Sequence, residues 1–196
     1  MNSTCNFTLH HYQEILSSLK GSEFEIIHDV DFPPNNVEEI ARIEASLGVS
    51  TKYFIRLRAK YYNALSLENV RLFNKLHKEY GHTVGLHFEA SFYEPSFVKD
   101  GITLEASLLG KSIETEIRYV SLHCPAKAGT ITEKDVPTGL QLYSFDSQYY
   151  KDKKYISDSG GRWREGCACN HIGKHPKLLI LTHPNWWYHS NPSENF

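Results

Sequence analysis

The 196-residue sequence lacks a long apolar run: no stretch approaches the roughly 18 residues needed to cross a bilayer. Charge of one sign is also scarce, since 21 Lys and Arg residues stand against 23 Asp and Glu residues and the basic ones are scattered. We therefore expect no transmembrane segment and no nucleic-acid partner. The first five residues have neither the charged start nor the apolar stretch of a signal peptide, which predicts a cytoplasmic protein.

Cysteine occurs only four times, and repeats, low-complexity tracts and linkers are absent. A chain of this size without an export signal does not need disulfides, so we expect free thiols and a single domain over residues 1–196. Histidine and aromatic residues are plentiful, with 11 His, 12 Tyr, 10 Phe and 3 Trp. This mixture suits a metal or acid–base site with an aromatic-walled, sugar-like pocket, although aromatic residues also fill cores.

Short apolar strands alternate with helical segments over the first two thirds of the chain. The expected strands are 24–28, 51–57, 83–88, 119–123, 154–157 and 178–182, and the expected helices are 37–47, 66–80 and 102–117. The stretch 126–152 is rich in Gly, Pro, Tyr and charges and is expected to be mostly loop, with short elements whose positions the sequence does not define. The alternation predicts an α/β fold with a parallel sheet or barrel, whose functional groups gather at the carboxyl ends of the strands.

Five expected strand ends carry Asp, His or Glu. They are His28-Asp29-Val30-Asp31, His87-Phe88-Glu89, His123-Cys124-Pro125, Asp158-Ser159 and His183-Pro184. Any one of them could be a capping or solvated group, but five together favour a site. Asp29 and Asp31 share a strand face, as do His87 and Glu89, whereas His82 faces the other way and is interpreted as structural. Carboxylates and imidazoles on one rim can hold a divalent metal and leave a base and an acid free, which indicates metal-assisted hydrolysis.

These residues lie in stretches that resemble the NodB-type polysaccharide deacetylases, in the branch whose first motif reads His-Asp-Val-Asp. The stretches are 27–32, 41–54, 81–87, 155–163 and 179–184. Their order and spacing are more specific than any one of them. The resemblance implies a distorted, incomplete (β/α) barrel, in keeping with a chain shorter than the about 250 residues of a full barrel. It also implies removal of an N- or O-acetyl group with one divalent metal ion, most often zinc.

The resemblance assigns roles by position. The general base would be Asp29, two metal ligands would be Asp31 and His87, and the general acid would be His183. Asp158, Arg162 and Trp163 would correspond to the segment that tunes the acid and walls the substrate pocket. Trp186, in the run Trp186-Trp187-Tyr188, is expected either to line a sugar subsite or to belong to a hydrophobic plug.

One ligand of the usual set is missing. The family has a further His four residues after its first histidine ligand, but this position is Ser91. His123 and Glu89 are the candidates for the third ligand, and His123 is favoured because zinc sites often use imidazole. If His123 instead takes the place of the family's Arg beside Asp29, Glu89 becomes the better ligand; otherwise Glu89 is placed with the substrate-binding residues.

The expected reaction is hydrolysis of an acetylated sugar or oligosaccharide. The metal would polarise the carbonyl and lower the pKa of its bound water toward about 7, Asp29 would take the proton, and His183 would protonate the leaving group. Two alternatives are a metal-dependent amidohydrolase acting on another small amide, such as a formamido sugar, and a non-catalytic carbohydrate-binding barrel. Ser91 is the main support for the second. Substrate, metal identity and oligomeric state stay open.

Two further patterns contain histidine or cysteine. Cys167-Ala168-Cys169-Asn170-His171, with His175 beyond it, resembles a zinc site, but the Cys-x-Cys spacing is tight and there is no second pair elsewhere. A plain loop or helix before the last strand is therefore favoured. The pair His10-His11 has no carboxylate pattern around it and is expected at the surface.

Overall fold

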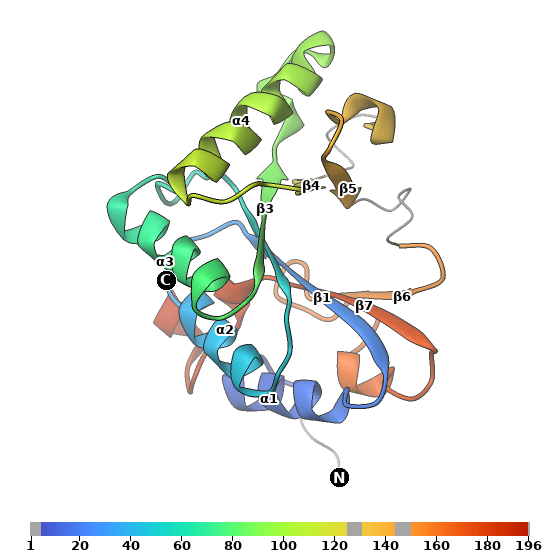
Figure 1. Ribbon diagram of the computed structural model, residues 1–196. Helices are drawn as coiled ribbons and strands as arrows, with labels where there is room; N and C mark the ends of the chain where they lie inside the picture. The colour runs from blue at the N-terminus through green and yellow to red at the C-terminus, as the bar shows by residue number, and fades with distance from the viewer. Residues whose placement is uncertain (1–4, 125–130, 144–149, 196) are drawn as a thin grey trace.

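A computed structural model describes residues 5–124, 131–143 and 150–195 (Figure 1). Its strands are β1 (Glu23–Val30), β2 (Lys52–Ile55), β3 (Thr83–Phe88), β4 (Tyr119–Leu122), β5 (Gln141–Tyr143), β6 (Lys154–Ser157) and β7 (Lys177–Thr182). They form one parallel sheet in the order β5-β4-β3-β2-β1-β7-β6. The sheet curls into a half-barrel, which confirms the predicted incomplete (β/α) barrel.

The described helices are α1 (Leu9–Ser18), α2 (Val37–Ser46), α3 (Leu67–Lys78) and α4 (Val98–Ser112). Figure 1 shows them on one side of the curved sheet. The helix α3 begins after Ser66, whose hydroxyl accepts a hydrogen bond from the amide of Asn69, as an N-cap does. None of the helices in the described ranges is long and apolar enough to cross a membrane.

Alternation along β1 separates the two faces of the sheet. Ile26 and Val30 pack in the main core beneath the helices, whereas Ile27 belongs to a second, smaller cluster that includes Phe54 and Leu181. Because successive side chains of a strand point to opposite faces, Asp29 lies on the same face as Ile27. The concave face of the half-barrel is therefore apolar around Ile27 and acidic at its rim, where Asp29 lies.

A buried carboxylate lies behind β1, between the sheet and α2. Glu44 has no exposed surface and accepts hydrogen bonds from the hydroxyls of Tyr12, Tyr53 (2.6 Å) and Thr51 (2.9 Å). Its Oε1 also lies 2.8 Å from Nε2 of His28. All of these groups come from different elements or loops, so one carboxylate joins α1, α2, β1 and β2.

The structural interpretation of His82 is confirmed. This side chain is buried, its Nε2 lies 2.9 Å from the carbonyl oxygen of Ala41, and its Nδ1 accepts a hydrogen bond from the amide of Thr51. His28, at one of the polar strand ends, is likewise buried and contacts Glu44 and Thr182 rather than the concave face.

Three elements differ from the expectation. The helix α1 was not predicted, although Thr8 caps it and Leu9, with other apolar residues, forms its buried face. The helix α4 begins four residues and ends five residues earlier than expected, and it contains Gly101, where an added Cβ would meet the ring of Tyr93 at 2.6 Å. The strand β5 lies within the expected loop 126–152, where it pairs with β4.

Parts of two expectations fall outside the described residues. These parts are residues 126–130 and 144–149 of the expected loop and residues 1–4 of the N-terminal stretch, which was expected not to be a signal peptide.

Candidate active site

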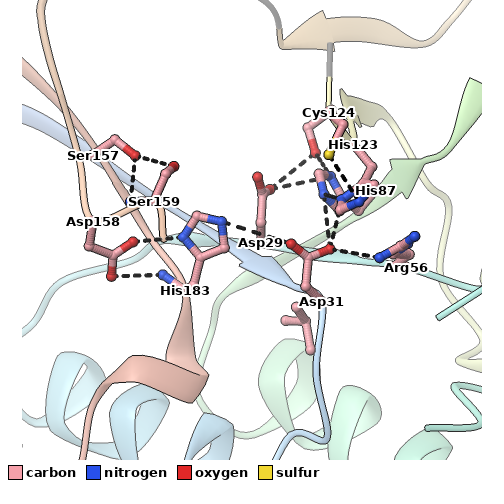
Figure 2. Close-up of polar contacts among 12 residues, drawn as sticks. Asp29, Asp31, Arg56, His87, His123, Cys124, Ser157, Asp158, Ser159 and His183 are labelled. Carbon is pink, nitrogen blue, oxygen red and sulfur yellow. Dashed lines mark hydrogen bonds and ion pairs between the residues drawn. The ribbon is translucent and has the colours of Figure 1, made fainter. Parts of the chain in front are cut away.

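Three side chains from three different strands meet at the rim of the half-barrel (Figure 2). Asp31 follows β1, His87 lies in β3 and His123 follows β4. The Oδ1 atom of Asp31 lies 2.9 Å from Nδ1 of His123 and 3.4 Å from Nε2 of His87. The two imidazole nitrogens are 3.1 Å apart. One carboxylate and two imidazoles thus present their ligand atoms to a common point, within 4.8 Å of one another.

This donor set fits a divalent cation. Oδ1 of Asp31 is buried, and its polar neighbours are the imidazole nitrogens of His87 and His123 and the guanidinium of Arg56 rather than a backbone or hydroxyl donor, so it can act as a ligand. Ser121 donates its hydroxyl proton to Oδ1 of Asp29 (3.2 Å), and its oxygen lies 2.6 Å from Nδ1 of His87. If Nδ1 of His87 carries the ring proton and donates it to Ser121, Nε2 keeps its lone pair on the side of Asp31. A carboxylate with two neutral imidazoles is a common zinc-binding set.

The two carboxylates of the site have opposite pKa shifts. Burial, with a smaller contribution from the Asp31 carboxylate, raises the pKa of Asp29, and this effect outweighs the nearby His87 and His183. Burial also opposes ionisation of Asp31, but the contacts with His87 and His123 outweigh it and lower the pKa of Asp31 well below its usual range. Asp31 is therefore the permanently ionised group, and Asp29 is the better proton acceptor.

His183 follows β7 on the other side of β1 and is held by Asp158. Its Nδ1 lies 2.6 Å from Oδ1 of Asp158, whose Oδ2 accepts hydrogen bonds from the His183 amide (3.0 Å) and the indole of Trp187 (3.1 Å). Burial lowers the pKa of His183, but the Asp158 carboxylate outweighs it and raises this pKa to about 9. The imidazole is therefore protonated at neutral pH and can act as an acid, with Nε2 3.9 Å from Oδ2 of Asp31.

Arg56, which follows β2, also reaches the site. Its Nη1 lies 3.5 Å from Oδ1 of Asp31, and its Nη2 pairs with Oε2 of Glu89. The other oxygen of Glu89 accepts a hydrogen bond from Ser91 (2.8 Å). Of the two candidates for the third ligand, His123 thus faces Asp31, while Glu89 faces Arg56. Arg56 was not among the predicted site residues, for two reasons. Only Asp, His and Glu were considered at the strand ends, and the strand 51–57 was expected to continue past residue 56.

A cavity of about 600 Å³ opens over the site. Its lining combines the polar groups Asp29, Asp31, His87, Ser121, His123 and His183 with the rings of Tyr143, Tyr150 and Tyr155 and the apolar floor residues Ile27 and Leu181. The volume is in the range of small-molecule sites, which are about 300–1,000 Å³.

Several residues expected near the substrate have other surroundings. Arg162 is exposed, and the ring of Trp163 stacks on Phe7 with centroids 5.8 Å apart. Trp186 packs over Gly161, where an added Cβ would lie 3.4 Å from its ring. The described residues that line the cavity include Arg164 but not Arg162, Trp163 or Trp186. Trp187 is fully buried in the main core.

The parallel half-barrel with a polar rim matches the incomplete (β/α) barrel of the carbohydrate esterase family 4 (CE4) deacetylases. A CE4 family pseudoenzyme from Bacillus anthracis is similar over 83% of this chain, with a TM-score of 0.55 and 13% identity. This chain spans only 55% of that protein. A family 4 carbohydrate esterase from Streptomyces lividans, solved in complex with acetate, has a TM-score of 0.56 and 10% identity over 84% of this chain and 80% of its own.

The chitin deacetylase of the fungal pathogen Colletotrichum lindemuthianum is similar over 88% of this chain and 78% of its own, with a TM-score of 0.54 and 13% identity. At such identities the similarity concerns the fold. At the level of sequence, no protein-family model and no curated protein matches the chain.

Proposed function

We propose that this protein is a zinc-dependent hydrolase that removes an acetyl group from an N- or O-acetylated carbohydrate, in the branch whose first motif reads His-Asp-Val-Asp. The observation that carries the proposal is the arrangement at the rim: a buried base and a protonated imidazole, Asp29 and His183, line the same cavity as Asp31, which with His87 and His123 makes a donor set for a divalent cation. A binding protein would not need a base, a ligand set and an acid together.

Each residue has one proposed task. Asp31, His87 and His123 would hold the cation, which when bound supplies a Lewis acid for the substrate carbonyl and lowers the pKa of a water molecule. Asp29 accepts the proton of the attacking water, since burial raises its pKa and Ser121 holds its Oδ1. His183 donates a proton to the leaving amine or hydroxyl.

The carbohydrate substrate is supported by the cavity and by the neighbours of the fold. Tyr143, Tyr150 and Tyr155 offer flat rings to the apolar faces of a pyranose, next to the polar rim. The similar structures include a family 4 carbohydrate esterase, a chitin deacetylase and a peptidoglycan N-acetylglucosamine deacetylase.

The test is release of acetate from N-acetylglucosamine oligomers and from O-acetylated xylo-oligosaccharides by protein loaded with zinc. We expect release that stops with a chelator, with Asp31→Asn because this site loses its metal, and with Asp29→Asn and His183→Ala although both keep it. A fully active His183→Ala protein would show that His183 is not the general acid. Formate release from formamido sugars, without acetate release, would mean that the group removed is a formyl group and not an acetyl group.

A second candidate, a carbohydrate-binding barrel without activity, is favoured by one observation. The guanidinium of Arg56 lies 3.5 Å from Oδ1 of Asp31, and a positive charge at this distance opposes a cation. The similar structures include a CE4 family pseudoenzyme and a mutant of it with restored enzymatic activity. Binding of the oligosaccharides without acetate or formate release, and without a metal that Asp31→Asn removes, would select this candidate.

A further inference from the structure

Four potential metal ligands from the two halves of the chain meet outside the rim site. Cys5, His11, Cys167 and Cys169 bring three sulfur atoms and one ring nitrogen within 4.8 Å of one another. Sγ of Cys167 lies 3.2 Å from Nε2 of His11 and 2.8 Å from Sγ of Cys169, which is 3.5 Å from Sγ of Cys5. In the sequence, the histidines near Cys167 and Cys169 are His171 and His175, but in the fold Cys5 and His11 complete the cluster instead.

The expected surface position of the histidine pair is wrong for His11. His10 is exposed on α1, but His11 is 4% exposed and points into the protein toward Cys167. Its Nδ1 lies 3.2 Å from Oε2 of Glu14, one turn further along the helix. A carboxylate that accepts the Nδ1 proton leaves the lone pair of Nε2 directed at the cysteines, which is the arrangement typical of histidines that bind zinc.

We propose that Cys5, His11, Cys167 and Cys169 bind a structural zinc ion. Three thiolates and one imidazole form a Cys₃His set, which favours zinc over the oxygen-seeking cations Mg²⁺ and Ca²⁺. Four protein ligands leave no open position for a substrate, so this ion has a structural role. On binding, the three thiol protons leave to solvent and the imidazole binds as the neutral base.

The position of this cluster indicates what the zinc stabilises. Cys167 and Cys169 flank Ala168 in a short 3-10 turn before β7, and Cys5 and His11 belong to the segment that enters and forms α1. The ion would therefore fasten the first helix to the loop that follows β6. The same region contains Phe7, which packs against Trp163 and Trp187.

This proposal concerns a place different from the proposed active site. Cys167 is packed in the main core on the helix side of the sheet, whereas Asp31 lies at the rim of the concave face. The two sites can thus be emptied independently. The zinc at the cysteines should be present whether or not the protein is a deacetylase.

The test is zinc analysis and zinc K-edge X-ray absorption on the Asp31→Asn protein, purified under reducing conditions. We expect one zinc per chain, with sulfur ligands at about 2.3 Å and a nitrogen ligand at about 2.0 Å. His11→Ala and Cys5→Ser should each lower zinc retention at least tenfold against a chelator. The matched control His10→Ala, on the same helix, should retain zinc as the parent does.

A second measurement tests the proposal without any substitution in the cluster, in case the His11→Ala and Cys5→Ser variants fail to fold. The full-length Asp31→Asn protein is loaded with Co²⁺ in place of zinc, and its near-ultraviolet thiolate-to-cobalt charge-transfer absorption is recorded. The band is expected, and it should be absent when the thiols are alkylated first. No band, no zinc per chain, or a disulfide between any of these cysteines in the reduced preparation would overturn the proposal.

Discussion

The ring of His183 and the carboxylate of Asp158 form a directional pair at the end of β7. Nδ1 of His183 lies 2.6 Å from Oδ1 of Asp158, and Asp158 has no exposed surface. Trp187 and the His183 amide bind the other carboxylate oxygen. This carboxylate therefore fixes the orientation of the ring and keeps its proton, while the opposite nitrogen faces the rim.

Replacing this partner should affect the acid without removing the metal. We expect Asp158→Asn to lower kcat/KM for acetate release by about 10²–10⁴-fold, the usual contribution of a positioned acid or base, with unchanged metal content. Asp100→Asn, an exposed substitution on α4, is the control and should have no effect. Activity of Asp158→Asn within a factor of two of the parent would contradict the role of the pair.

The third ligand can be decided by two matched variants. Asp31→Asn should abolish zinc binding at the rim. Because His123 faces Asp31 while Glu89 is paired with Arg56, His123→Ala should weaken this zinc binding by at least about 10–100-fold. Glu89→Gln should leave it within a few-fold. Zinc titration of metal-free protein by calorimetry measures both. The reverse order of effects would make Glu89 the ligand.

The carboxylate behind β1 should be essential for stability. Glu44→Ala leaves Tyr12, Tyr53 and His28 without their common partner in the core. Breaking one partner of a buried pair costs about 3–5 kcal/mol, which in a chain of this size corresponds to a fall in Tm of roughly 10 °C. Glu38→Ala, on the same helix, breaks a half-exposed pair with Lys75 of α3 and should cost at most about 1 kcal/mol. Equal melting temperatures for both variants would refute this.

Acid stability should depend on Glu25 in the lower part of the concave face. Burial would raise its pKa, but hydrogen bonds from Lys153, Lys52 and Tyr143 outweigh this effect and lower it. Because the pKa of Glu25 is lower in the folded state, its charge stabilises the fold. This stabilisation is complete above the ordinary pKa of 4.5 and is lost as the pH falls through the pKa of the folded state.

We therefore expect Glu25→Gln to lower the free energy of unfolding by about 1–3 kcal/mol at pH 7. The difference from the parent should shrink below pH 4.5, the ordinary pKa of the group. Urea unfolding at a series of pH values measures it, and Glu23→Gln, an exposed residue of the same strand, is the control. A difference independent of pH would show that the charge of Glu25 is not responsible.

Strand positions were predictable because burial on a parallel sheet leaves a local signal. The apolar run Thr83–Phe88 coincides with β3, and the Asp29-x-Asp31 spacing places both carboxylates on the cavity. The three residues of β5 have no such run, since they are a strand only through their pairing with β4. The helix α1 does carry a signal, the N-cap Thr8 before regularly spaced apolar residues, and a search for caps would have found it.

The site was predictable as a set of residue types but not as a set of contacts. Whether His123 or Glu89 completes the cluster depends on Arg56, which neutralises Glu89 across two strands. No spacing rule connects Cys5 to Cys169, which are 164 positions apart. Interactions of this kind are settled by tertiary packing, which a single sequence does not record.

The strand order has a consequence for synthesis on the ribosome. The strand β1 emerges early but lies between β2 and β7, and its pairing with β7 joins residues more than 150 positions apart. Until β7 has left the exit tunnel, one edge of β1 is unpaired and His183 is absent from the rim. The nascent chain thus carries an incomplete sheet with an open edge until β7 emerges, which exposes it to aggregation and makes chaperone association in that interval advantageous.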